Sequence, residues 1–170
     1  MNLPLLPPSS TPNAVSAWAQ RLASAVSFGW NVEHDVDGRH RFAWNDLTYN
    51  AGRFSGKGAM TWTVDSADQL SLMWRYVGKN TIELQWTILT SDVGGTADTE
   101  LRILLPDGLK VTHYMNATHW YSDAGTEGIG WAGAYPGDPY IRLYKLASGN
   151  WTLTAGDNTA TNGQVTLRVE

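Results

Sequence analysis

Residues 70–88 read LSLMWRYVGKNTIELQWTI, and this stretch decides the fold. Apolar side chains occupy every second position on both sides of Gly78-Lys79-Asn80. A period of two is that of a half-buried β-strand, and a short glycine-containing turn between two such runs predicts a β-hairpin. We expect four side chains of the first strand to share one face, namely Leu70, Leu72, Trp74 and Tyr76.

The same alternation continues on both sides of this hairpin. It recurs around residues 42–54, 60–64, 101–105, 111–115, 129–131, 140–146, 151–154 and 165–169, with turns rich in Gly, Pro and Asp between them. About eight or nine strands with no helix between them predict an antiparallel, jelly-roll-like β-sandwich and argue against a parallel α/β fold. Trp62, Trp74 and Trp86 keep the alternation and are expected in its core.

Residues 14–28 are the stretch with helical periodicity. Asn13 can cap the helix and Gly29 can end it. Apolar residues recur at steps of three and four, which is the seam of a coiled coil. The seam consists of Val15, Trp18, Leu22 and Ala25. Because so short a helix is marginal alone, we expect it to associate as a trimer. The alternative is an amphipathic helix that lies on its own β-domain.

The first 13 residues are rich in proline and leucine. Proline fixes φ and removes a hydrogen-bond donor, so this segment should be extended or polyproline II in form. The leucines favour a docking tether that orders on a partner over a solvated tail. The tether residues are Leu3, Pro4, Leu5, Leu6, Pro7 and Pro8. The expected organisation is therefore a docking tether (1–13), a trimerising helix and linker (14–38) and a β-sandwich head (39–170).

Composition narrows the classes of function. The net charge of −4 argues against nucleic acid and anionic membranes as partners. No apolar run approaches the roughly 20 residues that a membrane-spanning helix needs. The chain has no cysteine, which excludes disulfides and thiolate chemistry. Nine tryptophans among many glycines fit a β-sandwich core, a sugar-binding face, or both.

No motif for a cofactor, a metal or catalysis has the neighbouring sequence or the spacing that such a site requires. Residues 128–133 match G-x-G-x-x-G, but Tyr135-Pro136-Gly137 follows and cannot open the helix that a dinucleotide site requires. The histidines lack zinc spacing, and His113 and His119 are expected to be ordinary polar groups beside a strand. Glu83 and Glu100 are expected on solvent faces. We therefore predict no cofactor, no metal, no catalytic residue and no enzymatic activity.

The last third of the chain holds the candidate ligand-binding residues. Its aromatic side chains lie in or beside Gly-rich, turn-dense sequence, where rings can stack on sugars and neighbouring Asp and Asn can bind hydroxyl groups. The candidates are Trp120, Tyr121, Trp131, Tyr135 and Tyr140. The alternative is that these rings fill the core or an interface between subunits.

From Trp18 onward the chain resembles tailed-bacteriophage fibre proteins. Glu33-His34-x-x-Asp37-Gly38-x-His40, directly after a short helix, is similar to the helix-to-head junction of such fibres. Three further segments resemble β-domains at fibre tips, as does Gly149-Asn150-Trp151-Thr152 before the final strand that contains Gly163-Gln164-Val165-Thr166. The three segments are 58–64, 93–96 and 101–106.

The resemblance implies a jelly-roll-like, homotrimeric and non-catalytic virion protein. Residues 1–13 would dock on a larger virion protein of tail or capsid, and the head would attach to a glycan on the host surface. Because the chain is short and has no repetitive shaft, a capsid head-fibre or decoration protein without a receptor role is one alternative. A monomeric carbohydrate-binding module, with Trp120 and Trp131 as its platform, is the other.

Overall fold

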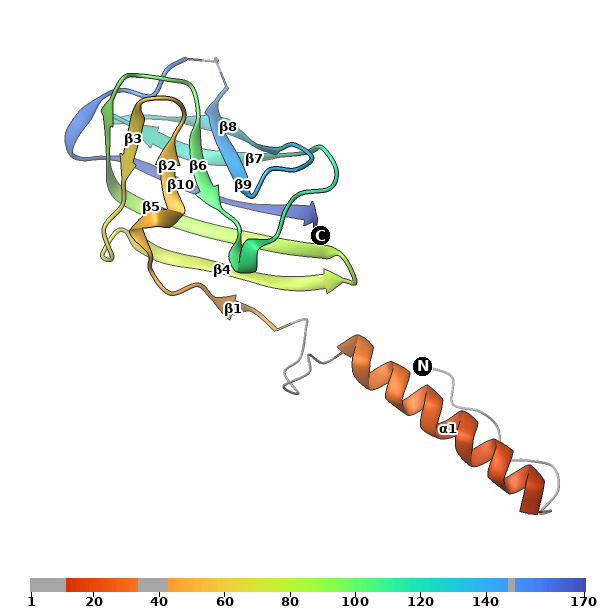
Figure 1. The fold of residues 1–170 in the computed structure, drawn as a ribbon. Coiled ribbons are helices and arrows are strands. Elements are labelled where there is room, and N and C mark those ends of the chain that lie inside the picture. Colours follow the sequence, from red (N-terminus) through yellow and green to blue (C-terminus); the bar gives the residue numbers. More distant parts are fainter. Residues whose placement is uncertain (1–11, 34–42, 147–148) are drawn as a thin grey trace. The chain divides into compact units, whose positions relative to one another are not determined.

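The computed structural model describes residues 12–33, 43–146 and 149–170 (Figure 1). The chain divides into two units, Met1–Ala43 and Trp44–Glu170. The docking tether predicted from Leu3 to Pro8 and the acidic linker after Glu33 lie outside the described residues. Among the residues that are described, no helix combines the length and the apolar character needed to cross a membrane.

Helix α1 spans Pro12–Glu33 and is longer at both ends than the helix expected from the sequence. Proline is well tolerated in the first turn of a helix, so Pro12 opens α1. Gly29 does not end it, because one interior glycine costs only about 1 kcal/mol relative to alanine. Within residues 16–26, the partly buried side chains are Trp18, Leu22 and Ala25. Their association with other copies of the chain stays a prediction.

The second unit is built from strands that all pair antiparallel in one sheet. The strands are β1 (Asn45–Asp46), β2 (Phe54–Gly56), β3 (Met60–Thr63), β4 (Gln69–Gly78), β5 (Thr81–Gly95), β6 (Leu101–Leu104), β7 (Met115–Asp123), β8 (Thr126–Ala134), β9 (Tyr140–Lys145) and β10 (Thr154–Arg168). Two 3-10 turns, η1 (Ala51–Arg53) and η2 (Pro106–Gly108), lie between them.

The sheet has the strand order β1-β4-β5-β10-β7-β8-β9-β6-β2. β2 stands at one end of this order, yet β3, the next strand in the chain, pairs with β5 in its interior. The sheet therefore curls over on itself, as Figure 1 shows. This mainly β, curled antiparallel architecture is consistent with a β-sandwich and confirms the coarse fold class expected from the sequence.

The central hairpin is β4–β5, and its register places the tryptophans inside. Trp74 lies opposite Leu84, and Leu72 lies opposite Trp86. The three tryptophans expected in the core are all buried, namely Trp62, Trp74 and Trp86. The expectation that Leu70 shares the face of Leu72 and Trp74 is wrong, because this side chain is 63% exposed. A register shift between Gln69 and Ser71 leaves Leu70 as an extra residue, which turns its side chain out of the core.

A chain of polar groups crosses the core. Trp86 Nε1 donates to Thr161 Oγ1 at 3.1 Å, and this oxygen lies 2.9 Å from His119 Nδ1. His119 Nε2 lies 3.1 Å from the Tyr144 carbonyl oxygen, and Nδ1 also lies 3.1 Å from the Trp120 carbonyl oxygen. Burial lowers the pKa of His119 by more than the nearby Tyr144 and Trp120 carbonyls raise it. Burial therefore favours the neutral form of the imidazole, and both of its nitrogens have partners inside the core.

His119 is consequently not the polar group beside a strand that the sequence suggests, since it is only 2% exposed. Glycines on the two neighbouring strands make room for its ring. A Cβ on Gly130 would stand 2.6 Å from His119 Nε2, and one on Gly163 would stand 2.9 Å from His119 Cβ and 2.5 Å from Trp86 Cζ2. Real Cβ contacts do not occur at these distances, so both positions require glycine.

Glu100 also departs from expectation. It precedes β6 and is 2% exposed, whereas a solvent face was expected. Arg102 Nε donates to Glu100 Oε1 at 2.6 Å, and the Tyr144 hydroxyl donates to Oε2 at 2.7 Å. Arg142 adds a second cation at 3.6 Å. A buried carboxylate is tolerated where cations and donors surround it in this way.

Candidate functional site

The outer face of β7, β8 and β9 carries aromatic side chains away from the core. Alternation along β7 buries His119 and Asp123 and turns Trp120 outward. On β8 it buries Ala132 and turns Trp131 outward. Trp131 lies opposite Thr118 of β7 on one side and Tyr144 of β9 on the other. Thus Trp131 occupies the middle of a three-strand surface.

A hollow of about 260 Å³ opens on this face. We call it the aromatic hollow; it is lined by Tyr114, Asn116, Trp131, Gly133, Tyr135 and Tyr144. Gly133 lies between Asn116 of β7 and Arg142 of β9 and has no side chain to fill the space. A Cβ built there would come no closer than 3.7 Å to its neighbours, which is ordinary contact. The absence of a side chain at Gly133 therefore opens the hollow without any close packing that demands glycine.

The rings around the hollow are accessible. Trp131 is 40% exposed, Tyr135 is 43% exposed and Tyr114 is 55% exposed. The Tyr114 and Tyr135 rings meet with centroids 5.1 Å apart and planes tilted by 59°. The Asn116 amide makes no hydrogen bond to any described residue and is exposed. Apolar ring faces and a free amide thus border the same space.

The guanidinium of Arg142 packs against two of the tyrosine rings and holds them in place. The Arg142 guanidinium lies 4.5 Å from the Tyr135 ring centroid and 5.3 Å from that of Tyr140. It donates twice to Asp138, at 2.9 and 2.8 Å. Although burial opposes its charge, the hydrogen bond to Asp138 and the nearby Glu100 carboxylate raise the pKa of Arg142. A permanently charged, bidentately held guanidinium makes a rigid support for both tyrosines.

Tyr144 supplies a hydroxyl that keeps its proton. Burial and the hydrogen bond to Glu100 raise the pKa of Tyr144 to about 12. The phenol is therefore a donor at neutral pH, and its proton is already engaged by Glu100 at 2.7 Å. Glu100 and Arg142 thus hold the Tyr144 ring in place beside the hollow.

The structure brings together part of the aromatic cluster predicted from the sequence. Trp131 and Tyr135 line the hollow, and Tyr140 packs against Arg142 beside it. Trp120 lies on the same outer face, opposite Ile129. Tyr121 differs from these candidates, because its side chain is partly buried and packs against the core.

Tyr121 packs there against Trp151, with ring centroids 5.6 Å apart and planes at 71°. Four residues of the hollow were missed by the sequence analysis: Tyr114, Asn116, Gly133 and Tyr144. The alternation of side chains along an extended chain could have indicated two of them, Tyr114 and Asn116. If Val111, His113 and Met115 share one face of an extended chain, Tyr114 and Asn116 fall on the other face.

Neither protein-family models nor curated proteins nor solved structures give a significant match to this chain. The class of site is therefore defined by the arrangement of its own residues. It is an open aromatic surface on a rigid antiparallel sheet. Within residues 12–33, 43–146 and 149–170, no three histidine or acidic side chains are placed where they could hold a metal ion.

Proposed function

We propose that this chain is the subunit of a homotrimeric, virion-type attachment fibre whose jelly-roll-like head binds a host-surface glycan. The observation that carries the proposal is the aromatic hollow. Sugar rings present apolar C–H faces and polar edges, so they match exposed aromatic rings that border a free amide. A shallow space of about 260 Å³ on an open face favours a sugar unit over a large apolar ligand.

The N-terminal part of the proposal rests on the sequence. The seam of Trp18, Leu22 and Ala25 along α1 supports a three-helix stalk, and residues 1–13 would tether it to a larger virion protein. Three weak sugar sites on one trimer gain avidity on a surface that displays many copies of the glycan. The resemblance of the chain to phage fibre proteins supports the virion as its location.

A glycan array with the full-length chain tests the binding function, followed by titration calorimetry on the best ligand. Trp131→Ala removes a stacking ring, and Gly133→Leu fills the hollow. Each should weaken binding at least tenfold, which is about 1.4 kcal/mol. Ile129→Ala is the matched control, because Ile129 is exposed on the same face of the same strand but does not line the hollow. Equal affinities for Trp131→Ala and Ile129→Ala would refute the site.

Light scattering on the same preparation tests the assembly, because a trimer has three times the subunit mass. A stable monomer at micromolar concentration that still binds glycan would favour the free carbohydrate-binding module. A trimer that binds no glycan would favour the capsid decoration protein. Immunogold labelling of virus particles would then distinguish attachment at the capsid from attachment at the tail.

A further inference from the structure

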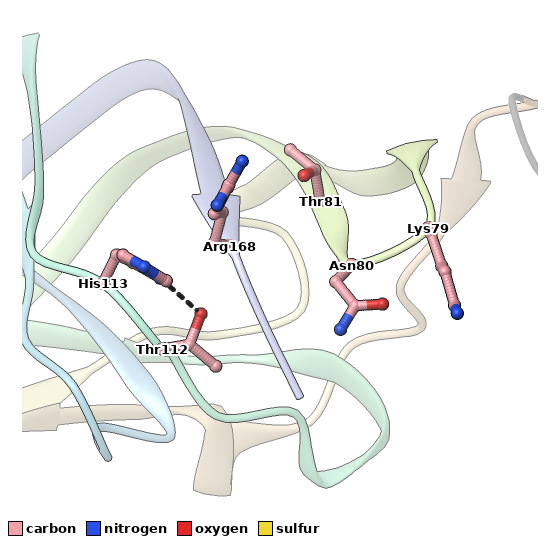
Figure 2. Close-up of a pocket in the computed structure, with 6 residues that line it drawn as sticks. All are labelled: Lys79, Asn80, Thr81, Thr112, His113 and Arg168. Carbon is pink, nitrogen blue, oxygen red and sulfur yellow. Dashed lines mark hydrogen bonds between the residues drawn. The ribbon is translucent and has the colours of Figure 1, made fainter.

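A second hollow lies on the sheet beyond the aromatic one, and its lining is cationic. It has a volume of about 420 Å³ and is formed by three separate segments. We call it the cationic hollow; Figure 2 shows its lining residues, which are Lys79, Asn80, Thr81, Thr112, His113 and Arg168. Among the described residues, neither Asp nor Glu lines this hollow.

The fold explains why these residues meet. The turn between β4 and β5 supplies Lys79 and Asn80, and Arg168 ends β10 directly opposite Thr81 of β5. The segment before β7 is tied to the same place, since the Thr112 amide donates to the Arg168 carbonyl at 2.8 Å. Thr112 Oγ1 lies 2.9 Å from the Nδ1 atom of His113, the dashed contact in Figure 2.

The two cations of this hollow lack the carboxylate partner that the other strand arginines have. Arg75, Arg102 and Arg142 each pair with a carboxylate. The side chains of Lys79 and Arg168 form no ion pair or hydrogen bond with any residue that the structure describes. In a chain with a net charge of −4, two unpaired permanent cations around one opening point to an anionic ligand.

The two hollows are joined. β7 and β10 pair only from Thr159 to Gly163 of β10, and the segments that precede β7 and follow β10 meet at the bridge between Val111 and Val169. Between these points they separate, and a cleft of about 460 Å³ lies between them. Thr81, His113 and Arg168 line both this cleft and the cationic hollow, whereas Tyr114 lines both the cleft and the aromatic hollow.

We infer that the joined surface of the cationic hollow, the cleft and the aromatic hollow, from Lys79 to Trp131, selects acidic oligosaccharides. A carboxylated sugar unit binds in the cationic hollow while a neighbouring unit stacks in the aromatic hollow. The inference rests on the proposed glycan-binding function and adds the class of glycan.

The planar Arg168 guanidinium matches a carboxylate with two parallel hydrogen bonds, and Lys79 adds a point charge. Two permanent cations are few for nucleic acid, whose binding proteins commonly neutralise about 6–10 phosphates.

Paired ligands test this charge preference on the full-length chain. Each carboxylated oligosaccharide of a panel is compared with its own methyl ester, which keeps the sugar and removes the charge. The wild-type chain should bind the acid at least tenfold more tightly at low salt, and the preference should shrink as salt is added. The double variant Lys79→Gln with Arg168→Gln should lose the preference and keep its affinity for the ester.

Lys110→Gln is the control, because Lys110 is an exposed cation outside the lining of either hollow. It should keep the preference for the acid. Equal binding of acid and ester, both lost in Trp131→Ala, would overturn this inference and leave the proposed function intact. Binding to neither ligand would overturn both. Tighter binding of a single-stranded oligonucleotide than of any acidic sugar, or a preference for sulfated over carboxylated sugars, would replace the carboxylate with a different anion.

Discussion

The hydroxyl of Thr161 is the pivot of the buried polar chain, and its removal is a sharp test of that chain. Thr161→Val keeps the branched shape of the side chain and deletes one oxygen. Trp86 Nε1 then loses the acceptor at 3.1 Å, and His119 Nδ1 loses its hydroxyl partner at 2.9 Å. Thr161 is 0% exposed, so water cannot replace the missing oxygen without a rearrangement of the core.

The magnitude follows from two unsatisfied groups. A buried polar group left without its partner costs about 1–3 kcal/mol, and the two effects share one site and are not fully additive. We therefore expect Thr161→Val to lower the free energy of unfolding by about 2–4 kcal/mol. That loss is a large part of the roughly 5–15 kcal/mol that stabilises a typical domain.

Thr159 offers a matched control two residues earlier on β10. It is also 0% exposed, but its Oγ1 makes no hydrogen bond to any described residue. Thr159→Val deletes a hydroxyl that already lacks a partner. It should leave the free energy of unfolding unchanged or raise it by up to about 1 kcal/mol, because a buried, unpaired hydroxyl is itself unfavourable.

Urea unfolding of the full-length chain, followed by tryptophan fluorescence, measures both variants. Their midpoints should separate while the slope m stays the same, which shows that stability and not the compactness of the unfolded chain has changed. If Thr161→Val and Thr159→Val lose the same free energy, the polar chain from Trp86 to His119 does not stabilise the core.

Three further predictions follow from the same structure. Burial lowers the pKa of His119 below 6.5, so the unfolded chain binds more protons below that pH. The free energy of unfolding should fall as pH drops below about 6.5, and an NMR titration of His119 should show a midpoint below that of a free histidine. Gly130→Ala should cost more than about 2 kcal/mol in urea unfolding, because its Cβ would collide with the backbone of β9, whereas Gly133→Ala should stay within about 0.5 kcal/mol. Trp18→Asp combined with Leu22→Asp should dissociate the trimer in light scattering, and an unchanged mass would show that α1 does not organise the assembly.

Much of the β-architecture could be predicted from local sequence. The period of two on both sides of Gly78-Lys79-Asn80 was sufficient for the hairpin and for the buried Trp74 and Trp86. The bulge at Leu70 was not predictable, because an inserted residue keeps the same local composition and reveals itself only in the register with β5. The long-range order in which β10 lies between β5 and β7 also has no local signal.

In the candidate site, too, some features could be predicted from local sequence and others depend on long-range packing. Trp131 and Tyr135 were predicted as ligand-binding residues from their aromatic character, and both side chains are exposed. Tyr121 was assigned to the same site, although its position on β7 faces the core beside His119. Which face of β7 is buried depends on what the other strands place against it. The burial of Glu100 likewise depends on Arg102, from the strand that follows it, and on partners from β9 that no spacing in the sequence connects to it.

The G-x-G-x-x-G match at residues 128–133 gains a physical meaning from the strand it occupies. Gly128 and Gly130 are two residues apart and face the core, where Cβ atoms would strike the Tyr121 hydroxyl and the His119 ring. Gly133 has the opposite parity and faces outward, where its missing side chain opens the aromatic hollow. Gly128 and Gly130 therefore serve stability, whereas Gly133 borders the proposed binding site, which predicts different phenotypes. Gly130→Ala should impair folding, whereas Gly133→Leu should retain the fold and lose glycan affinity, and a common phenotype for both would refute this division.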